Sequence, residues 1–310
     1  MTEKSKTNLR IAVFYYTQTG QLLDILKSLT NPLKERGCEI IFKEIVPQEP
    51  FPFPWTSDQF YEIFPESRAE VPFKMKEMDF SDILDADLVI LGYQPWYLAP
   101  SVPVSSFLRL ESTGDYLRGR NVLAVAGTRN MWVSAIKSIK SRLDGYGANL
   151  VGHIALEDRH QNLISVLTIF RWLINNRKEA GKYLPEAGVS QKDIDSVAAI
   201  SEDIYKAVSA GDYSLLQKAI VDKDGLRFNP GLYFIESNGN KIWGKWAHWV
   251  LKKGEYGDPS RRFRLRLFKY YLLTLLFGIS PFGSLFFMLT WPLRRRSYRK
   301  IEKNILFLQN

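Results

Sequence analysis

The stretch Arg10–Gln21, RIAVFYYTQTGQ, decides the fold of this chain. Arg10–Tyr16 is rich in β-branched and aromatic residues and contains no helix breaker, which predicts a strand buried on both faces. Gln21–Arg36 then spaces its apolar residues as a helix does and is followed by Gly37, a typical helix stop. A buried strand that turns directly into a helix begins a βα unit, so the sequence predicts a parallel sheet.

The same alternation of strands and helices continues to about residue 210. Further strands are expected at Cys38–Ile45, Leu88–Leu91, Asn121–Ala126 and Leu150–Leu156. Helices are expected at about 131–144 and from the capping-box pattern Ser190–Asp193 to about Ala210. Five strands separated by helices predict an α/β, doubly wound, five-stranded parallel sheet, in which ligands bind at the carboxyl ends of the strands.

Three loops follow the first, third and fourth strands at that edge. The first loop, Thr17-Gln18-Thr19-Gly20-Gln21, leads into a helix, where backbone N–H groups and the helix dipole favour a phosphate. It lacks the Gly-Lys-Ser/Thr of a nucleoside triphosphate loop and the spaced glycines of a dinucleotide site. An ordinary βα turn explains the same residues, so the first loop alone leaves both interpretations open.

The other two loops carry flat, amphipathic side chains beside glycine or proline. They are Gly92-Tyr93-Gln94-Pro95-Trp96-Tyr97 and Gly127-Thr128-Arg129-Asn130-Met131-Trp132. Such side chains can sandwich a planar ring, although tryptophans that only cap the sheet give the same pattern. All three loops at one edge of the sheet favour a site for a flat ligand that carries a phosphate.

This arrangement resembles the flavodoxin-like FMN-binding domain. In that family the first loop holds the FMN phosphate, and the loops after the third and fourth strands flank the isoalloxazine ring. The resemblance therefore implies FMN contacts for Thr17, Gln18, Thr19, Gly20, Gln21, Gln94, Pro95, Trp96, Tyr97, Gly127, Thr128, Arg129, Asn130 and Trp132.

A narrower resemblance covers most of the first 240 residues. Tyr15–Gln21, Pro50–Trp55 (PFPFPW) and Pro65–Ser67 are similar to bacterial proteins described as dialkylresorcinol condensing enzymes. These accompany a ketosynthase-type enzyme in making dialkylresorcinols, including those esterified to flexirubin-type pigments. Condensation chemistry needs an activated cysteine or a Ser/His/Asp arrangement, and this sequence shows neither pattern. The resemblance then implies an FMN-dependent aromatase that oxidises a hydrophobic dialkyl cyclohexanedione beside a ketosynthase-type partner.

Two other functions fit the same residues: a membrane-associated, flavodoxin-type NAD(P)H:quinone reductase or electron carrier, and a flavin-free scaffold. Candidates for proton transfer at the carboxyl edge of the sheet are Tyr93, Tyr97, Asp158 and His160. Arg129 is a candidate for stabilising negative charge on the flavin or on an enolate. Arg129 in a salt bridge with Glu157 or Glu111, and His160 as a solvated loop residue, are the structural alternatives.

Two segments of this chain depart from a minimal flavodoxin. Pro47–Pro72 is rich in proline and phenylalanine, which predicts an extended lid or packing material. Asn162–Asn175 is apolar nearly all round, which predicts either the roof of a substrate channel or a helix buried by the C-terminal segment. We therefore expect a flavodoxin-like domain at 8–224, with a helical insertion at about 159–188, and a basic, aromatic-rich, membrane-associating extension at 225–310.

The charge distribution separates the extension from the body. Residues 241–310 hold 15 Lys/Arg and 3 Asp/Glu, a net charge of +12, whereas residues 1–240 carry a net charge of −3. A basic tail on an acidic body predicts a polyanionic partner for the tail, and the aliphatic neighbours of its basic clusters argue against nucleic acid. The single cysteine excludes an intramolecular disulfide, and the histidines lack partners at metal spacing, so we expect no metal site.

The tail carries the membrane signal. Tyr270–Leu293 has no charged residue and is flanked on both sides by arginine clusters. Glycines and a proline at 278–283 predict a kink or a reversal, hence a re-entrant or interfacial dip that contacts the membrane through 261–300. Packing on the body or on a second subunit is the alternative.

The N-terminus lacks a signal-peptide pattern, so we expect a cytoplasmic protein at the inner face of the cytoplasmic membrane. Before this tail segment, three tryptophans are spaced along one helical face, Trp243, Trp246 and Trp249. This face is either an anchor at the membrane interface or a surface that packs on the core of the sheet domain.

Overall fold

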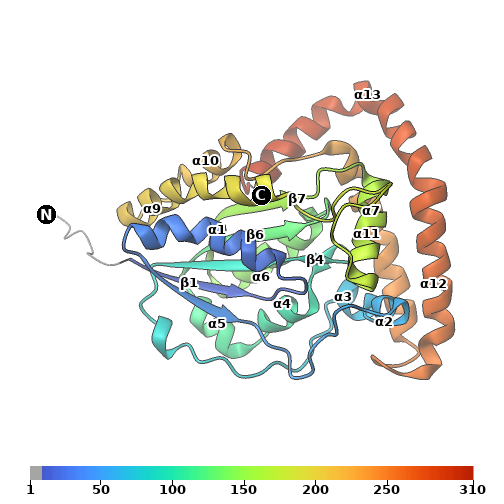
Figure 1. Cartoon of the computed structure of the whole chain (residues 1–310), viewed down its shortest axis with the longest axis horizontal. Helices are drawn as coiled ribbons and strands as arrows, with labels where there is room; N and C mark the ends of the chain where they lie inside the picture. Colours follow the sequence, from blue (N-terminus) through green and yellow to red (C-terminus); the bar gives the residue numbers. More distant parts are fainter. Residues whose placement is uncertain (1–8, 310) are drawn as a thin grey trace, which may run out of the picture.

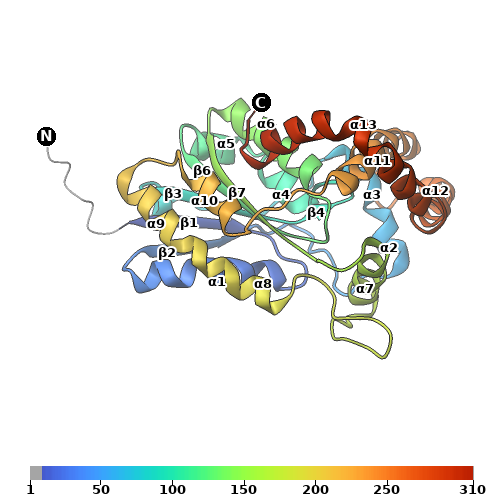
Figure 2. The same ribbon diagram turned by 90° about the horizontal axis from the view of Figure 1, so that it is seen from above.

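The computed structural model describes residues 9–309 and contains a five-stranded parallel sheet with helices on both faces (Figures 1 and 2). Its strands are β1 (Arg10–Tyr15), β2 (Glu39–Glu44), β3 (Leu88–Tyr93), β6 (Asn121–Thr128) and β7 (Asn149–Glu157). They lie in the order β2-β1-β3-β6-β7, and every neighbouring pair is parallel. The chain first adds a strand on one side of β1 and then crosses to the other, which creates a switch point between β1 and β3. The predicted fold class is confirmed.

Helices cover both faces of this sheet and its carboxyl edge. Figure 2 shows α1, α8 and α9 on one side of the sheet and α4, α5 and α6 on the other. The helices are α1 (Gln21–Glu35), α2 (Ser57–Glu62), α3 (Phe64–Ala69), α4 (Val102–Phe107), α5 (Glu111–Leu117), α6 (Val133–Tyr146), α7 (Asn162–Asn175), α8 (Gln191–Ser196), α9 (Ser201–Ala210), α10 (Leu216–Asp222), α11 (Pro230–Leu251), α12 (Arg262–Thr274) and α13 (Ser280–Leu306). Shorter elements are the hairpin β4 (Pro95–Trp96) and β5 (Ala99–Pro100), the 3₁₀ turns η1 (Ser81–Ile83), η2 (Val197–Ile200) and η3 (Pro259–Arg261), and the π-helical turn η4 (Leu275–Ile279).

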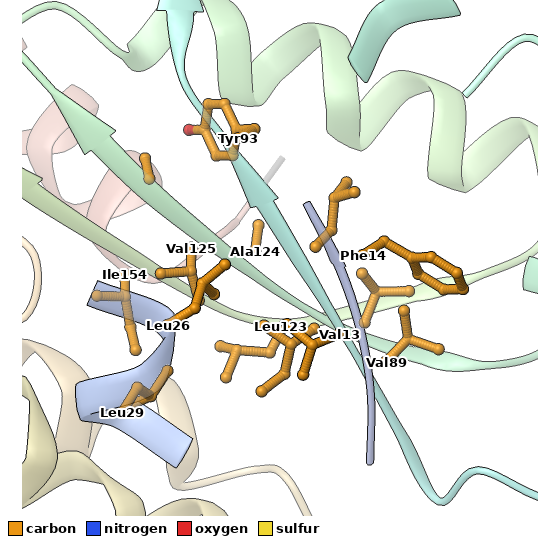
Figure 3. Close-up of a cluster of buried hydrophobic side chains, with 14 of the residues drawn as sticks. Val13, Phe14, Leu26, Leu29, Val89, Tyr93, Leu123, Ala124, Val125 and Ile154 are labelled. Carbon is orange, nitrogen blue, oxygen red and sulfur yellow. The ribbon is translucent and has the colours of Figure 1, made fainter. Parts of the chain in front are cut away.

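The core lies between the sheet and its helices. Figure 3 shows side chains of the central strands beside Leu26 and Leu29 of α1, and all of these are buried. Gly92 on β3 lets α1 come this close, because a Cβ there would lie 2.7 Å from Leu26 Cδ1 and 3.2 Å from Tyr15 Cβ. Strands that are apolar on both faces are therefore covered on both faces, as their sequence predicts.

The predicted strands are observed with small differences at their ends, but Pro47–Pro72, expected to be extended, contains the helices α2 and α3, because its prolines lie before α2, at the start of α3 and after α3. β3 extends to Tyr93 and β6 to Thr128, which brings both strands two residues nearer to the carboxyl edge than expected. The last body helix is divided into α8, η2 and α9, and Ser190 caps α8 by accepting a hydrogen bond from the backbone N–H of Asp193. The helix expected at Asn162–Asn175 is α7, with the same bounds.

The C-terminal chain does not reverse where its glycines and proline predicted. α12, η4 and α13 follow one another as a helical path through 278–283. The π-helical turn η4 ends two residues before Pro281, and a wider turn of this kind accommodates an extra residue without ending the helix. Figure 1 shows that the path turns over farther along, within α13, which contains Pro292. In the portion of the chain described, no helix is both long and apolar enough to cross a membrane.

A buried ion pair fastens these C-terminal helices to the sheet domain. The Arg261 side chain is fully buried and Glu66 of α3 is 2% exposed. The Arg261 Nη2 group donates to Glu66 Oε2 at 2.8 Å and to the carbonyl oxygen of Glu62 at 2.7 Å. Phe64 stacks on Phe268 of α12 beside this pair, with ring centroids 3.5 Å apart. Arg261, which the sequence placed with the membrane-facing cluster, therefore lies in the interior.

We predict that Arg261→Ala lowers the free energy of unfolding by about 3–5 kcal/mol, because it leaves the Glu66 carboxylate buried without its partner. The exposed neighbour Arg262 is the matched control, and Arg262→Ala is expected to change stability by less than about 0.5 kcal/mol. Urea unfolding followed by circular dichroism measures both. Equal losses for the two variants would contradict this role of the buried pair.

Candidate functional site

A cavity of about 370 Å³ lies at the carboxyl edge of the sheet. Its walls come from the loops after β1, β3 and β6, from the segment before α2, and from α7, α11, α12, η4 and α13. Figure 1 shows α7, α11 and α12 beyond the arrowheads of the strands, where they enclose this edge. The volume lies in the range of small-molecule sites, and the position is the one where doubly wound sheets bind ligands.

The first loop leads from β1 into α1 with its helix terminus uncapped by any side chain among the described residues. Gly20 has φ +85°, a left-handed conformation that favours glycine, and Thr17 Oγ1 accepts a hydrogen bond from the Gly20 N–H at 3.1 Å. The side-chain amide of Gln21 turns away and pairs with both backbone groups of Val189 at 3.0 Å. At Gln21 only the backbone N–H is therefore left for a ligand, while Gln18 reaches the cavity wall.

The loop after β3 forms the tight hairpin β4–β5 and supplies aromatic wall. Its two central residues, Tyr97 and Leu98, have φ +49° and +66°, which is strained for side chains of this size. The Tyr97 hydroxyl donates to the carbonyl oxygen of Phe60 at 2.6 Å, and burial raises its pKa well above the usual range. Trp96 packs edge-on against Trp55 with ring centroids 5.1 Å apart. Pro95, Trp96, Tyr97 and Leu98 all line the cavity.

The segment expected to be a lid or packing material contributes to the cavity wall. Trp55 is 5% exposed, and its backbone N–H donates to the carbonyl oxygen of Leu173 on α7 at 2.8 Å. Trp55 and Phe60 line the cavity from one side, and Phe170 and Leu173 of α7 line it from the next. α7 therefore contributes wall to the channel that the sequence predicted it to roof.

Arg129 and Asn130, in the loop after β6, meet the start of α7. The Arg129 Nη1 group donates to Asn162 Oδ1 at 2.6 Å, and Asn130 Nδ2 donates to the same oxygen at 3.0 Å. Arg129 is thus held by Asn162, whereas the structural alternative was a salt bridge to Glu157 or Glu111. Burial lowers the pKa of Arg129 to about 10, so it stays cationic at neutral pH. Arg129, Thr128 and Gln18 give the cavity a polar end at the sheet edge.

Other predicted residues lie outside the cavity wall. His160 is 39% exposed, and its Nδ1 lies 2.7 Å from Asp158 Oδ1, while Ser165 Oγ donates to the other oxygen of Asp158 at 2.8 Å. Tyr93 is buried with its hydroxyl 2.9 Å from His153 Nε2. Trp132 is 2% exposed, packs against His153 and donates its indole N–H to Glu157.

Two amides from the predicted set, Gln94 and Asn130, each keep one buried polar atom without a hydrogen-bond partner in the described chain, Nε2 and Oδ1 respectively. These two amides do not line the cavity, and neither do five further residues of the predicted set, although the loops that carry them border it: Thr17, Thr19, Gly20, Gln21 and Gly127. Within residues 9–309 no group of three or more acidic, histidine or cysteine side chains could hold a metal ion.

Sequence reasoning missed the wall that the C-terminal helices contribute. Leu272, Leu275, Leu276 and Ile279 line the cavity, together with Trp243 of α11. The spacing of these four aliphatic residues is that of one helical face, which is the signal that could have identified them. Their position inside an uncharged run concealed it, because every face of that run is apolar.

Comparison with known proteins finds no matching family model and no matching curated protein. Solved structures with a similar course of the chain include a flavodoxin from the domain Archaea, at 12% identity and a TM-score of 0.39, covering 64% of this chain and 99% of that one. Others are a Lactobacillus acidophilus flavoprotein in complex with FMN (15%, 0.37, covering 47% and 92%) and Megasphaera elsdenii flavodoxin (14%, 0.32, covering 49% and 89%). The fold assignment itself rests on the strand order and parallel pairing described above.

We predict a pH-dependent stability difference at Glu157, below the β6 loop. Burial raises the pKa of this carboxyl to about 7, although the Trp132 indole N–H lowers it, so the folded protein keeps Glu157 protonated where the unfolded chain ionises it. Ionisation then destabilises the fold as the pH rises toward 7. The free energy of unfolding of Glu157→Gln, measured relative to that of the parent, should therefore rise by about 2–3 kcal/mol between pH 5 and pH 8.

Urea unfolding at both pH values measures this gain. The difference between variant and parent isolates Glu157 from buried His153, whose lowered pKa of about 3 acts in the opposite direction below pH 6.5. Exposed Glu111 is the control, and Glu111→Gln should leave the pH dependence unchanged. A gain that is equal at the two pH values would refute the raised pKa.

Proposed function

We propose that this chain is an FMN-dependent oxidoreductase that removes two hydrogen atoms from a dialkyl cyclohexanedione to give a dialkylresorcinol. The observation that carries the proposal is that Gln18, in the loop before the uncapped helix terminus at Gly20, lines an aromatic-walled cavity at the switch point of the sheet. The substrate class follows from the resemblance of Tyr15–Gln21 and Pro50–Trp55 to dialkylresorcinol condensing enzymes, which also implies a ketosynthase-type partner as the source of the ring.

The residues present fit the cofactor. The backbone N–H groups and hydroxyls of 17–21 suit the phosphate, because no side chain caps α1 among the described residues and, at this terminus, only the Gly20 N–H has a side-chain acceptor, Thr17 Oγ1. Trp96, Tyr97, Thr128 and Arg129 suit the ring system, because they combine flat walls with hydrogen-bonding groups. When bound, FMN would supply the acceptor for the hydride that leaves the substrate.

The side chains of this protein would prepare the substrate for that loss. A cyclic 1,3-dione ionises readily to an enolate, and the Arg129 cation at the polar end of the cavity would stabilise the negative charge. Tyr97 keeps its proton, since burial raises its pKa, and serves as a hydrogen-bonding and positioning group. His160 lies outside the cavity wall, so the proton released would reach solvent without it.

A membrane-associated NAD(P)H:quinone reductase or electron carrier is the second candidate. The observation that favours it is the apolar cavity itself, because its long aliphatic and aromatic wall suits a quinone tail as well as an alkylated dione. The two functions differ in which molecule reduces the flavin.

We place either activity in the cytoplasm at the inner face of the cytoplasmic membrane, with residues 262–300 on the bilayer. One face of the α12–α13 path exposes a stripe of large apolar side chains, with exposed fractions from 39% to 89%: Phe263, Leu267, Tyr270, Phe277, Phe282, Leu285, Leu289 and Leu293. Exposed cations flank the stripe and no acidic residue lies between 259 and 301. Apolar patches of this extent beside basic clusters favour an anionic lipid surface.

We predict that Gly20→Val weakens FMN binding at least about tenfold, because a β-branched residue at positive φ distorts the turn that presents the N–H donors. Gly37, at the other end of α1, is the matched control, since its φ of +86° and empty surroundings are nearly those of Gly20. Fluorescence titration of the apoprotein with FMN measures the dissociation constants. If Gly20→Val binds FMN as Gly37→Val does, the first loop does not hold the phosphate.

We predict that a 2,5-dialkylcyclohexane-1,3-dione bleaches the oxidised flavin spectrum of the purified holoprotein in an anaerobic single turnover and yields one equivalent of the resorcinol. NADPH mixed in parallel is the comparison, and we expect it to bleach the flavin at least about a hundredfold more slowly. Bleaching by NADPH alone, followed by reoxidation with a quinone, would establish the reductase and reject the aromatase.

A further inference from the structure

The C-terminal helical path carries apolar side chains on two sides. One side lines the cavity, and the other faces outward. Leu272, Leu275, Leu276 and Ile279 line the cavity, and Gly283 continues this wall at the start of α13. The exposed stripe defined above, from Phe263 to Leu293, faces outward on the same helices. One helical wall therefore separates the interior of the cavity from the surface that the proposed function places on lipid.

The cavity changes character along its length. Most of its polar wall groups lie at the sheet edge and in the first turn of α7: Gln18, Thr128, Arg129 and Asn162. The C-terminal helices add two more, Asn238 of α11 and Ser280 of α13. The wall formed by α7, α11 and η4 is predominantly aliphatic and aromatic. Such a gradient suits an amphiphile whose oxygenated head lies at the sheet edge and whose alkyl chain extends toward the C-terminal helices.

The rim of the cavity lies at the apolar end. Of the residues that line it, the exposed ones are Asn238 and Ile242 of α11 and Ile279 of η4. Ile242 is 43% and Ile279 is 53% exposed, and Ile279 lies between the stripe members Phe277 and Phe282 in sequence. The most open part of the wall is thus at the edge of the outward apolar stripe.

We propose that this cavity is loaded directly from an anionic phospholipid surface through the rim at Ile242 and Ile279. The ligand is an uncharged amphiphile with an alkyl chain, which leaves the bilayer head first and keeps its chain at the rim. The proposal rests on the membrane placement within the proposed function, but it requires neither bound flavin nor turnover. Charge complementarity selects lipid over a second copy of this chain, because the stripe is bordered by cations alone: Arg262, Arg266, Arg295, Arg296, Arg299 and Lys300.

The experiment uses the full chain and vesicles of phosphatidylglycerol and phosphatidylcholine that contain 12-(1-pyrenyl)dodecan-1-ol as the probe. After timed incubation the protein is released with salt, separated from the vesicles by flotation, and assayed for pyrene per protein. We expect loading to be at least about tenfold faster from these vesicles than from pure phosphatidylcholine vesicles, since the cations must first hold the protein on the surface.

Two arginine substitutions separate loading from membrane binding. Ile279→Arg places a charge at the rim and should slow loading at least about tenfold while vesicle binding is retained. Leu293→Arg adds the same charge to the exposed stripe, at a residue that is 89% exposed and does not line the cavity, and should load at the parental rate. Ile242→Arg tests the opposite side of the rim and should behave as Ile279→Arg does, with circular dichroism confirming the fold of each variant.

Equal loading of Ile279→Arg, Ile242→Arg and Leu293→Arg would overturn the proposal. So would equal loading from both kinds of vesicle, or a chain that binds neither vesicle and forms a dimer that Leu293→Arg dissociates in sedimentation. A protein that loads as expected but does not bind FMN or oxidise a dione would refute the proposed function and leave the loading route standing.

Discussion

A parallel sheet delivers the carboxyl ends of all its strands to one edge, and this constraint organises the rest of the molecule. The edge presents the positive terminus of α1 and loops that no neighbouring strand can pair. Small doubly wound domains leave such an edge open to solvent and ligand. Here three further groups of helices, α2–α3, α7 and α11–α13, enclose it, so that the crevice becomes a cavity with a largely apolar wall.

Two buried carboxylates hold that enclosure in place, and each joins the body to the C-terminal helices. Glu66, on α3, receives the guanidinium of Arg261. Glu236, on α11, accepts the backbone N–H of Ser134 at the start of α6, where the helix dipole favours its negative charge even though burial raises its pKa. A carboxylate is costly to bury unless it is paired, so both contacts fix orientation as well as position. The tail is consequently an integral wall of the site.

Periodicity predicted the sheet domain well, since apolar runs such as Leu88–Leu91 have few alternatives once they alternate with amphipathic helices. The site was predicted only where it follows strands directly, as at Gln18, Trp96 and Arg129. The partners of these residues come from far along the chain: Asn162 binds Arg129 across 33 residues and Val189 binds Gln21 across 168. Nothing local distinguishes buried Arg261 from exposed Arg262, because burial is decided by Glu66, 195 residues away.

The two apolar faces of the tail also decide how its role can be dissected. Truncation before Arg261 would remove the stripe, one wall of the cavity and the cation that neutralises Glu66 together. Loss of membrane association, of ligand binding and of stability would then be inseparable, because one segment supplies all three. Substitutions confined to a single face avoid this, since Leu293 is 89% exposed and does not line the cavity, whereas Leu272 is buried and does. The sequence of a helix that is apolar all round does not show which of its faces is buried. In this chain the structure assigns one face to the site and the other to the surface.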